Sequence, residues 1–450
     1  MSMPVEGMVS EMDFFTTPLV AKQIEWAEYV KHQPVAPVQN SEVIEFIINP
    51  IRDQYIDLSK TKVYIKGKVI NSASSQDLAA DEPYAPVNLL ANSLFKQCNV
   101  TFNDKHVSSG AQTFAHTSYL ETLTSYNKGT KETSLQAAGY FEDSPGKFEE
   151  VNDFSQNDGA EKRRNLSKSS KSVEMIFKLH SPVFNVDKCI PGNVKINVKL
   201  TRSPPEFYMM RKAAYGTTAA PVVSANLVFN IQSIYLKVFK VKPVNNVFIA
   251  QQSILLKTPA KYVLPYVDTK IFTISQGFSS ISFDNIFLDL VPSRILLVMV
   301  DADAMNGSYL KNPYNFKHNN INHLVLVKDG VHHPPEGYQP DFTNGARYLE
   351  CYQDFMQCLD FWGRNKNNGI TPKMYLDGFT IFAWDLTPDK SAATSNFNQP
   401  MSGTLRLEMK FKTNLTSNVN VFVYGESKNM MEIDINGITT LDHERRKNMY

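Results

Sequence analysis

The sequence predicts a mainly β protein in which one β-rich unit occurs twice, and three observations support this. Aromatic residues make up 11% of the 450 residues, and together with abundant Val, Ile and Thr they favour strands over helices. Several segments alternate apolar and polar residues with a period of two, as in VKINVKL at 194–200. The order of expected elements in the first half of the chain returns in the second half, so we expect two similar sandwiches in succession.

The composition is that of a folded, nearly neutral protein. Charged residues make up 20% and hydrophobic residues 42%, and a chain of this length can bury two ordinary cores. With 46 Lys and Arg against 45 Asp and Glu, the net charge is +1, so any contact with DNA must be local. The four widely spaced cysteines favour reduced thiols. We find no signal peptide and no stretch that could span a membrane, so we expect synthesis and assembly inside a cell.

The first half contains an expected arm and the first unit. Residues 1–40 combine aromatic side chains with four prolines and cannot form a core of their own, so we interpret them as an arm. The first unit is expected at 41–243, with one helix at 116–127 among its strands. Residues 142–172 have no apolar period and are predicted to be a long exposed loop. Its basic residues, which could also form a nuclear import signal or a receptor-facing tip, are Lys162, Arg163, Arg164, Lys168 and Lys171.

The second unit is expected at 244–430, followed by a tail at 431–450. A loop-rich insertion at 306–345 precedes a helix at 345–361, in the same order as in the first unit. Loops of such unequal length do not suit a propeller or an up-and-down barrel, whereas a two-sheet Greek-key sandwich accommodates them. We therefore predict an all-β fold of two consecutive eight-stranded jelly-roll sandwiches, a double jelly roll, with short inserted helices.

An ordered set of motifs carries a resemblance to a known family. The motifs are EFIINP and DLSKTKVYIKGKV at 45–69, PVNLLANSLFKQCNVTFN at 86–103, SYLETLTSY at 118–126, FKLHSPVF and VKINVKLTRS at 177–203, NGSYLKNPYNFKHNN at 306–320, LDGFTIFAWDLTPD at 376–389, and SGTLRLEMKFKTNL with VNVFVYGES at 402–427. The chain resembles the double jelly-roll major capsid proteins of Polinton (Maverick) elements and adintoviruses over roughly residues 40–435.

The resemblance implies a structural role in a virion and no enzymatic activity. Members of this family form trimers whose six jelly rolls make a pseudo-hexameric capsomer, and these capsomers tile an icosahedral shell around double-stranded DNA. The expected partners are further copies of the chain and a separate single jelly-roll penton protein, with only weak local contacts to the packaged DNA. The expected location is the virion capsid, assembled in the cytoplasm or nucleus of a host cell, and no cofactor or metal is expected.

Two terminal segments contain candidate contact residues. Phe14, Phe15 and Trp26 in the arm could extend the core or clamp a neighbouring capsomer, and the resemblance favours the clamp. The tail residues Arg445, Arg446 and Lys447 could face packaged DNA, because basic termini neutralise phosphate locally. A solvated charged end is an equally good interpretation of this tail.

The sequence contains none of the motifs of common enzymes. It has no G-x-x-x-x-G-K-[ST] loop, G-x-G-x-x-G turn, H-E-x-x-H helix or G-x-S-x-G elbow. The pairs His318/His323 and His332/His333 could bind a metal, but no adjoining carboxylate completes a set, so structural histidines are the preferred interpretation. Cys351 and Cys358 are expected in the core rather than in a zinc site.

Three alternatives remain open. A duplicated β-sandwich could be a carbohydrate-binding protein or a bicupin-like enzyme, since fold alone does not determine function. A cupin needs an H-x-H pair on a strand, and the sequence has none. A lectin site, formed by aromatic residues and carboxylates from several loops, is neither predicted nor excluded. A capsid gene retained in an animal genome without making virions would have the same sequence features.

Overall fold

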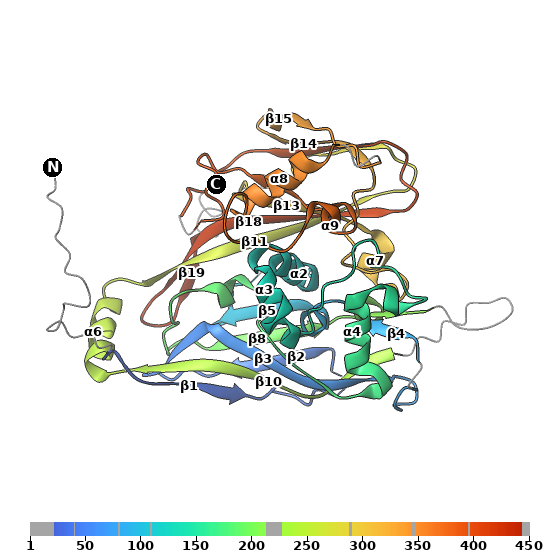
Figure 1. Cartoon of the computed structure of the whole chain (residues 1–450). Coiled ribbons are helices and arrows are strands. Elements are labelled where there is room, and N and C mark those ends of the chain that lie inside the picture. The colour runs from blue at the N-terminus through green and yellow to red at the C-terminus, as the bar shows by residue number, and fades with distance from the viewer. Residues whose placement is uncertain are drawn as a thin grey trace, which may run out of the picture.

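The computed structural model describes residues 22–39, 41–79, 82–108, 110–212, 227–287, 290–343, 347–394 and 397–442. Within these ranges the chain forms two β-sandwiches, one stacked above the other in Figure 1, with helices between them and at their ends. Each sandwich consists of two antiparallel sheets.

The first sandwich pairs a sheet of order β1-β10-β3-β7 with a sheet of order β2-β8-β5-β6. Its strands are β1 (Ile24–His32), β2 (Val43–Ile48), β3 (Tyr55–Asn71), β5 (Phe95–Phe102), β6 (Lys105–His106), β7 (Val173–Phe177), β8 (Ile196–Arg202) and β10 (Leu227–Pro243). The short strands β4 (Tyr84–Pro86) and β9 (Met209–Arg211) pair with each other at its rim.

The second sandwich pairs β11-β18-β13-β16 with β12-β17-β14-β15, and β19 adds to β18. Its strands are β11 (Ala260–Ile274), β12 (Ser280–Phe283), β13 (Arg294–Asp301), β14 (Ile321–Lys328), β15 (Val331–Tyr338), β16 (Phe382–Asp385), β17 (Leu405–Phe411), β18 (Val419–Ile433) and β19 (Thr439–Leu441).

The two sandwiches have the same strand order. In each, the first strand along the chain lies beside the eighth, the eighth beside the third, and the third beside the sixth. The opposite sheet joins the second, seventh, fourth and fifth strands in the same way in both units. This is the jelly-roll topology, in which Greek-key connections link the two sheets. The predicted all-β double jelly roll is confirmed, including the repeat of one architecture in the two halves of the chain.

Alternating side chains build the two cores, as the period of two predicted. On β8 the residues Ile196, Val198 and Leu200 are fully buried, while the lysine between the last two faces outward. Strand β10 alternates in the same way over most of its length. Because successive side chains of a strand point to opposite faces, this pattern places one apolar face of each sheet against its partner sheet.

Helices occupy corresponding positions in the two units. They are α1 (Leu90–Ser93), α2 (Phe114–Ser125), α3 (Lys128–Glu132), α4 (Asp158–Ser167), α5 (Pro205–Tyr208), α6 (Asn245–Leu255), α7 (Ala302–Asn306), α8 (Leu349–Cys358) and α9 (Pro372–Leu376), with short 3-10 turns at Ser134–Ala138, Phe154–Gln156, Lys168–Ser170 and Pro182–Asn185. Helices α2 and α8 confirm the two predicted helices, and both follow the fifth strand of their unit.

Three segments differ from the predictions. Residues 142–172 are not an exposed loop, because they contain α4 and bury several of its side chains. Within the insertion at 306–345, residues 321–338 form the hairpin β14–β15 rather than loops. Strand β1 lies within residues 1–40, which were assigned to an arm. Because β1 pairs with β10 along its length, the first sandwich includes residues 24–32.

Candidate assembly surfaces

Helix α2 lies between the two sandwiches, as Figure 1 shows. Ten of its twelve residues are buried, so the single apolar stripe expected from the sequence understates its contacts. The ring of His116 packs edge-on against Tyr314 of the second unit at a centroid distance of 5.8 Å, and also contacts Phe422. Tyr119 stacks on Tyr314 at 4.1 Å. Burial lowers the pKa of His116 to about 4, so this ring is neutral at physiological pH.

The insertions after the fifth strand of each unit meet at this junction. The buried Lys131 of α3 donates hydrogen bonds from Nζ to the carbonyl oxygens of Leu123, at 3.0 Å, and Asn368, at 2.8 Å. The backbone N–H of Gly146 donates to the carbonyl oxygen of Asp377 at 2.8 Å. Because the bonds to Asn368 and Asp377 join residues of different units, the two insertions hold the sandwiches in one relative orientation.

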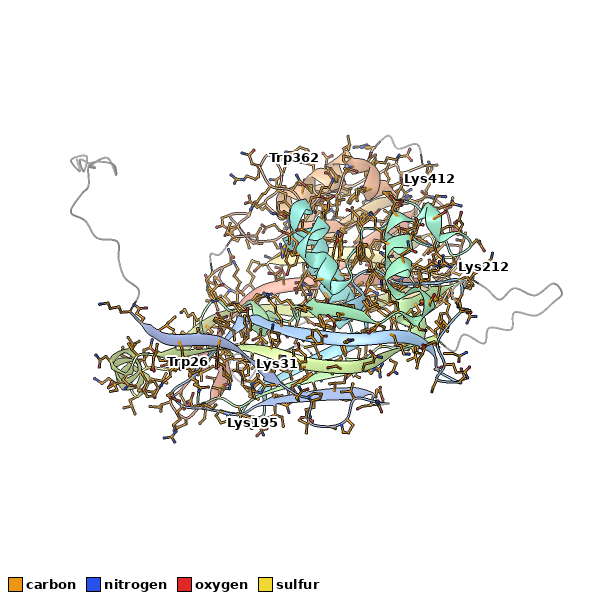
Figure 2. All side chains as sticks on the ribbon, turned by 60° about the horizontal axis from the view of Figure 1, so that its bottom comes forward. Trp26, Lys31, Lys195, Lys212, Trp362 and Lys412 are labelled. Atoms are coloured by element: carbon orange, nitrogen blue, oxygen red, sulfur yellow. The ribbon has the colours of Figure 1, made fainter. Side chains whose placement is uncertain are left out.

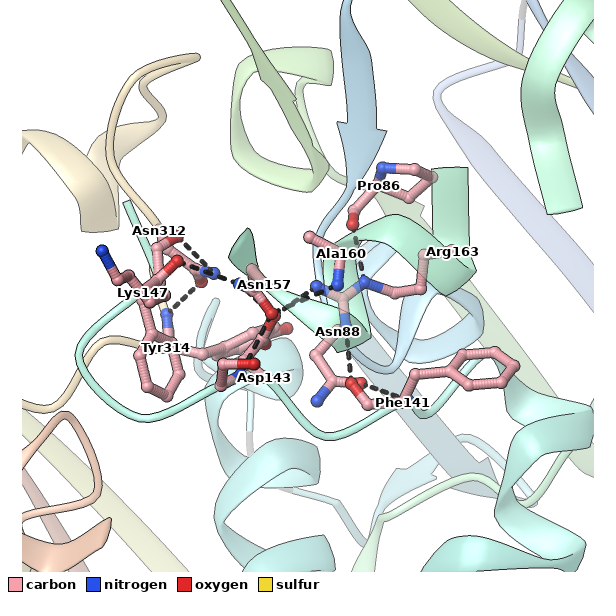
Figure 3. A network of polar contacts seen from close by, with 12 residues as sticks. Pro86, Asn88, Phe141, Asp143, Lys147, Asn157, Ala160, Arg163, Asn312 and Tyr314 are labelled. Atoms are coloured by element: carbon pink, nitrogen blue, oxygen red, sulfur yellow. Dashed lines mark hydrogen bonds and ion pairs between the residues drawn. The ribbon is translucent and has the colours of Figure 1, made fainter. Parts of the chain in front are cut away.

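A buried ion pair organises the segment that was predicted to be a loop, and Figure 3 shows its surroundings. The side chain of Arg163 is 2% exposed and that of Asp143 is 0% exposed, and Nη2 of the arginine lies 2.5 Å from Oδ1 of the aspartate. The same guanidinium donates to the carbonyl oxygens of Pro86, at 2.8 Å, and Phe141. Asn157 caps α4 and donates to Oδ1 of Asp143 at 2.9 Å. Arg163 therefore has a structural role rather than a role in an exposed basic tip.

The outer face of the sheet β1-β10-β3-β7 carries three lysines in register. Lys31 on β1 lies opposite Lys237 on β10, which in turn lies opposite Lys62 on β3. In the described part of the chain none of the three forms an ion pair, whereas Lys60, Lys66 and Lys68 on the same face each have a carboxylate partner. Directly opposed like charges destabilise a sheet, so this lysine row is a candidate contact surface.

Aromatic rings support the lysine row. The Nζ of Lys31 lies 4.9 Å from the ring centroid of Tyr235, and that of Lys237 lies 5.2 Å from the ring centroid of Tyr29. Tyr235 also stacks on Tyr64 at 4.5 Å. Cation–π attraction offsets part of the repulsion between the ammonium groups. Figure 2 labels Lys31 along β1, on the sheet that is turned toward the viewer.

A second exposed surface lies on α6, which connects the two sandwiches at one end of the molecule in Figure 1. No residue of this helix is buried, although it contains several apolar side chains. A groove with a volume of about 510 Å³ lies between α6 and the ends of both sandwiches. This helix was not among the predicted elements, although its apolar residues at 247–249 and 254–256 were a signal for it.

Some residues singled out in the sequence lie outside the described ranges. These are Phe14 and Phe15 of the arm and Arg445, Arg446 and Lys447 of the tail. Trp26 lies on β1, partly buried and opposite Lys242 of β10. It therefore belongs to a strand of the first jelly roll.

The described residues offer no cluster for metal chemistry. No group of three His, Cys, Asp or Glu residues converges within them. The ring of His318 stacks on Phe342 at 4.3 Å, and the carbonyl oxygen of His333 accepts a hydrogen bond from Trp384. Cys351 and Cys358 are buried and free, as expected for core residues. None of the described helices combines the length and apolarity that a bilayer crossing requires.

Comparisons with known proteins identify the fold. No protein family model matches the chain. In sequence it is 23% identical, over 356 residues, to an uncharacterized protein of Caenorhabditis elegans, covering 76% of this chain and 80% of that protein.

Solved structures of viral capsids match nearly the whole chain. The match to a chain of the Sputnik virophage structure covers 98% of this chain and 93% of the virophage chain, with a TM-score of 0.64 and 13% sequence identity. The match to the faustovirus major capsid protein covers 94% of this chain and 92% of the faustovirus chain, with a TM-score of 0.59 and 10% sequence identity. The match to the mavirus major capsid protein covers 98% of this chain and 96% of the mavirus chain, with a TM-score of 0.54 and 11% sequence identity. The chain thus has the fold of the viral double jelly-roll major capsid proteins.

Proposed function

We propose that the protein is a structural virion protein, the major capsid protein of a double-stranded DNA virus or of a Polinton-type element. The observation that carries this proposal is the double jelly roll itself, which matches virophage and faustovirus capsid structures over more than nine tenths of the chain. The duplicated strand order and the junction that fixes the two units rigidly suit a building block. The motifs at residues 45–427 support a place among Polinton and adintovirus capsid proteins.

The shape of the molecule suggests how it would assemble. Two similar but non-identical sandwiches in one chain allow three chains to form a closed ring with six jelly rolls, in which each unit makes a heterologous contact with the next. Such a pseudo-hexameric trimer would tile an icosahedral shell, and a separate single jelly-roll protein would occupy the vertices. Contact with the packaged DNA would be local, because the chain has a net charge of only +1.

We assign the lysine row, Lys31, Lys62 and Lys237, to a lateral contact between copies. Three unpaired ammonium groups on a sheet face gain most from carboxylates on a neighbouring protein, because charge complementarity suppresses wrong contacts and fixes register. Reversal of one charge, as in Lys62→Glu, is expected to weaken association without unfolding the monomer. Lys195→Glu, which changes an exposed lysine directly before β8 in the other sheet, is the matched control.

The test is the state of assembly of the full chain. Expressed protein is expected to elute as a species of three times 50.9 kDa by light scattering, and electron microscopy should show threefold blocks or shells. A monomer that persists at high concentration and physiological salt would contradict the proposal. A glycan array and an activity screen distinguish a capsid protein from the alternative, a sugar-binding or bicupin-like protein. Only the alternative should bind a particular glycan or turn over a substrate.

A further inference from the structure

Helix α6 exposes more apolar surface than a short helix can sustain alone. Ile249, Ile254 and the adjoining Leu256 are 62%, 64% and 70% exposed, and none of the helix is buried. A helix of this length is marginal in water and owes its stability to packing of its apolar side chains. The contacts that hold it here are few, chiefly the ring of Tyr55 against Phe248 and a 2.7 Å hydrogen bond from the Tyr55 hydroxyl to Gln251. We infer that another segment covers α6.

The groove beside α6 is formed by both sandwiches. Cys189 and Pro191 line it from the first unit and Tyr262 from the second, and the Tyr262 hydroxyl donates to the carbonyl oxygen of Cys189 at 2.9 Å. Lys188 and Lys261 also line it, and the first donates from Nζ to the carbonyl oxygen of the second at 3.0 Å. A segment bound in this groove would therefore contact both units at once.

The first described residues of the chain lie beside the start of α6. The backbone N–H of Val244, which precedes α6, donates to the carbonyl oxygen of Gln23 at 3.1 Å. Phe15 lies eight residues before Gln23, and eight extended residues span about 26 Å. Helix α6 is about 16 Å long at 1.5 Å per residue. Phe14 and Phe15 can therefore reach every part of α6 and of the groove.

The chemistry of residues 1–21 matches that of the groove. The segment has two adjacent aromatic residues, Phe14 and Phe15, and three carboxylates, among them Glu11 and Asp13, and contains no Lys or Arg. The groove is mainly apolar and includes Lys188 and Lys261 among its lining residues, the second of which pairs with Glu432 at 3.9 Å. Apolar burial and opposite charge both favour this pairing.

We propose that residues 1–21 dock in the groove of their own chain, with Phe14 and Phe15 against α6, and so strap the two jelly rolls together. Attachment at the start of α6 gives the segment a millimolar effective concentration, which a second copy does not have in dilute solution. The proposed occupant of the groove is thus residues 1–21 of the same chain. The alternative is the clamp on a neighbouring copy that the family resemblance favoured for Phe14 and Phe15.

Disulfide trapping to Cys189 tests the docking directly. In the full chain, Phe14→Cys and, separately, Phe15→Cys place a thiol where a bond to Cys189 can form if the Cα atoms come within about 4.4–6.8 Å. Mild oxidation is done at alkaline pH, because burial raises the pKa of the Cys189 thiol. We expect one of the two variants to give a faster-migrating monomer on a non-reducing gel and a 14–189 or 15–189 cross-linked peptide. The controls are the same variants with Cys189→Ser, and Ser2→Cys, which should remain uncross-linked.

The outcomes are distinct. A disulfide-linked dimer in place of the monomer would overturn the proposal in favour of the clamp, and no cross-link from either position would overturn it as well. These readouts do not depend on whether the chain forms trimers. Absence of the cross-link therefore leaves the capsid proposal standing, and absence of trimers leaves the docking proposal standing.

A second measurement uses the natural thiols. Cys98, Cys351 and Cys358 are buried, so a maleimide labels Cys189 first in the native protein. We expect the double change Phe14→Ser and Phe15→Ser to raise the labelling rate of Cys189 about tenfold, as expected when a docked segment at millimolar effective concentration is released. Met3→Ser is the control and should not change the rate. An unchanged rate in the double variant would contradict the proposal.

Discussion

Replacement of Arg163 by alanine should destabilise the protein strongly, although the sequence places this residue in a charged, polar stretch. The change removes the ion pair with Asp143, whose side chain is 0% exposed, and two hydrogen bonds to backbone carbonyl oxygens. The carboxylate would then lie in the interior without its cation. Asn157 would still donate one hydrogen bond to it.

The expected loss follows from the burial of both partners. Removal of one member of a buried ion pair costs about 3–5 kcal/mol, because the other charge remains desolvated and uncompensated. With an unfolding entropy of about 2 cal/mol/K per residue, a loss of about 4 kcal/mol lowers the melting temperature of a cooperative unit of this size by about 4–5 °C. Lys162→Ala, next to it but exposed, should change the free energy of unfolding by less than about 0.5 kcal/mol.

Denaturant unfolding of Arg163→Ala and Lys162→Ala measures the loss of unfolding free energy in each variant. Asp143→Ala and the double variant Asp143→Ala with Arg163→Ala complete a double-mutant cycle, and we expect the double variant to lose much less than the sum of the single changes. A loss below about 1 kcal/mol in Arg163→Ala, or additive losses in the cycle, would refute the assignment of a buried, coupled pair.

Three further predictions rest on other parts of the fold. Burial lowers the pKa of His116 to about 4 and that of His180 to about 3 from 6.5, so each ring binds a proton more readily in the unfolded chain and lowers stability as the pH drops toward 4. Burial raises the pKa of Glu121 to about 8, which acts in the opposite direction, so the test is the difference between wild type and His116→Gln: between pH 7.5 and 4.5 the wild type should lose about 3 kcal/mol more unfolding free energy than the variant. Lys237→Glu should raise monomer stability by about 0.5 kcal/mol, measured by denaturant unfolding, because the new carboxylate lies between two lysines. Gly67→Ala should lower the melting temperature at a cost of about 1–3 kcal/mol, since its Cβ would lie 2.5 Å from the carbonyl oxygen of Asn230.

The repeated architecture could be predicted because it depends on patterns that are local in the sequence. Alternation such as that at 194–200 specifies a half-buried strand, and the three- and four-residue spacing at Tyr119, Leu120 and Leu123 specifies a helix. Both confirmed helices have these signals, and the order of elements then repeats. The fold class thus follows from periodicities that each segment carries by itself.

Other features depend on contacts that no local pattern records. Arg163 lies in a polar helix, and its burial becomes evident only when the carbonyl oxygen of Pro86, far earlier in the chain, accepts its hydrogen bond. Residues 331–338 contain two prolines and were assigned to a loop, but β15 is an edge strand, where the missing N–H groups do not interrupt a central ladder. The in-register lysine row likewise requires the pairing of three strands that are distant in sequence.

The junction between the units explains why two copies of one topology behave as a single block. The insertion after the fifth strand carries α2, α3 and α4 in the first unit and α8 and α9 in the second, and hydrogen bonds from Lys131 and Gly146 join these insertions. The corresponding insertions of both units thus contact each other, although their helices differ. The outer face of the sheet β1-β10-β3-β7 stays exposed and carries the lysine row, whereas β13 is buried on both of its faces. A rigid pair with unequal outer faces can form directional contacts with neighbours, and a ring-forming capsid subunit requires contacts of this kind.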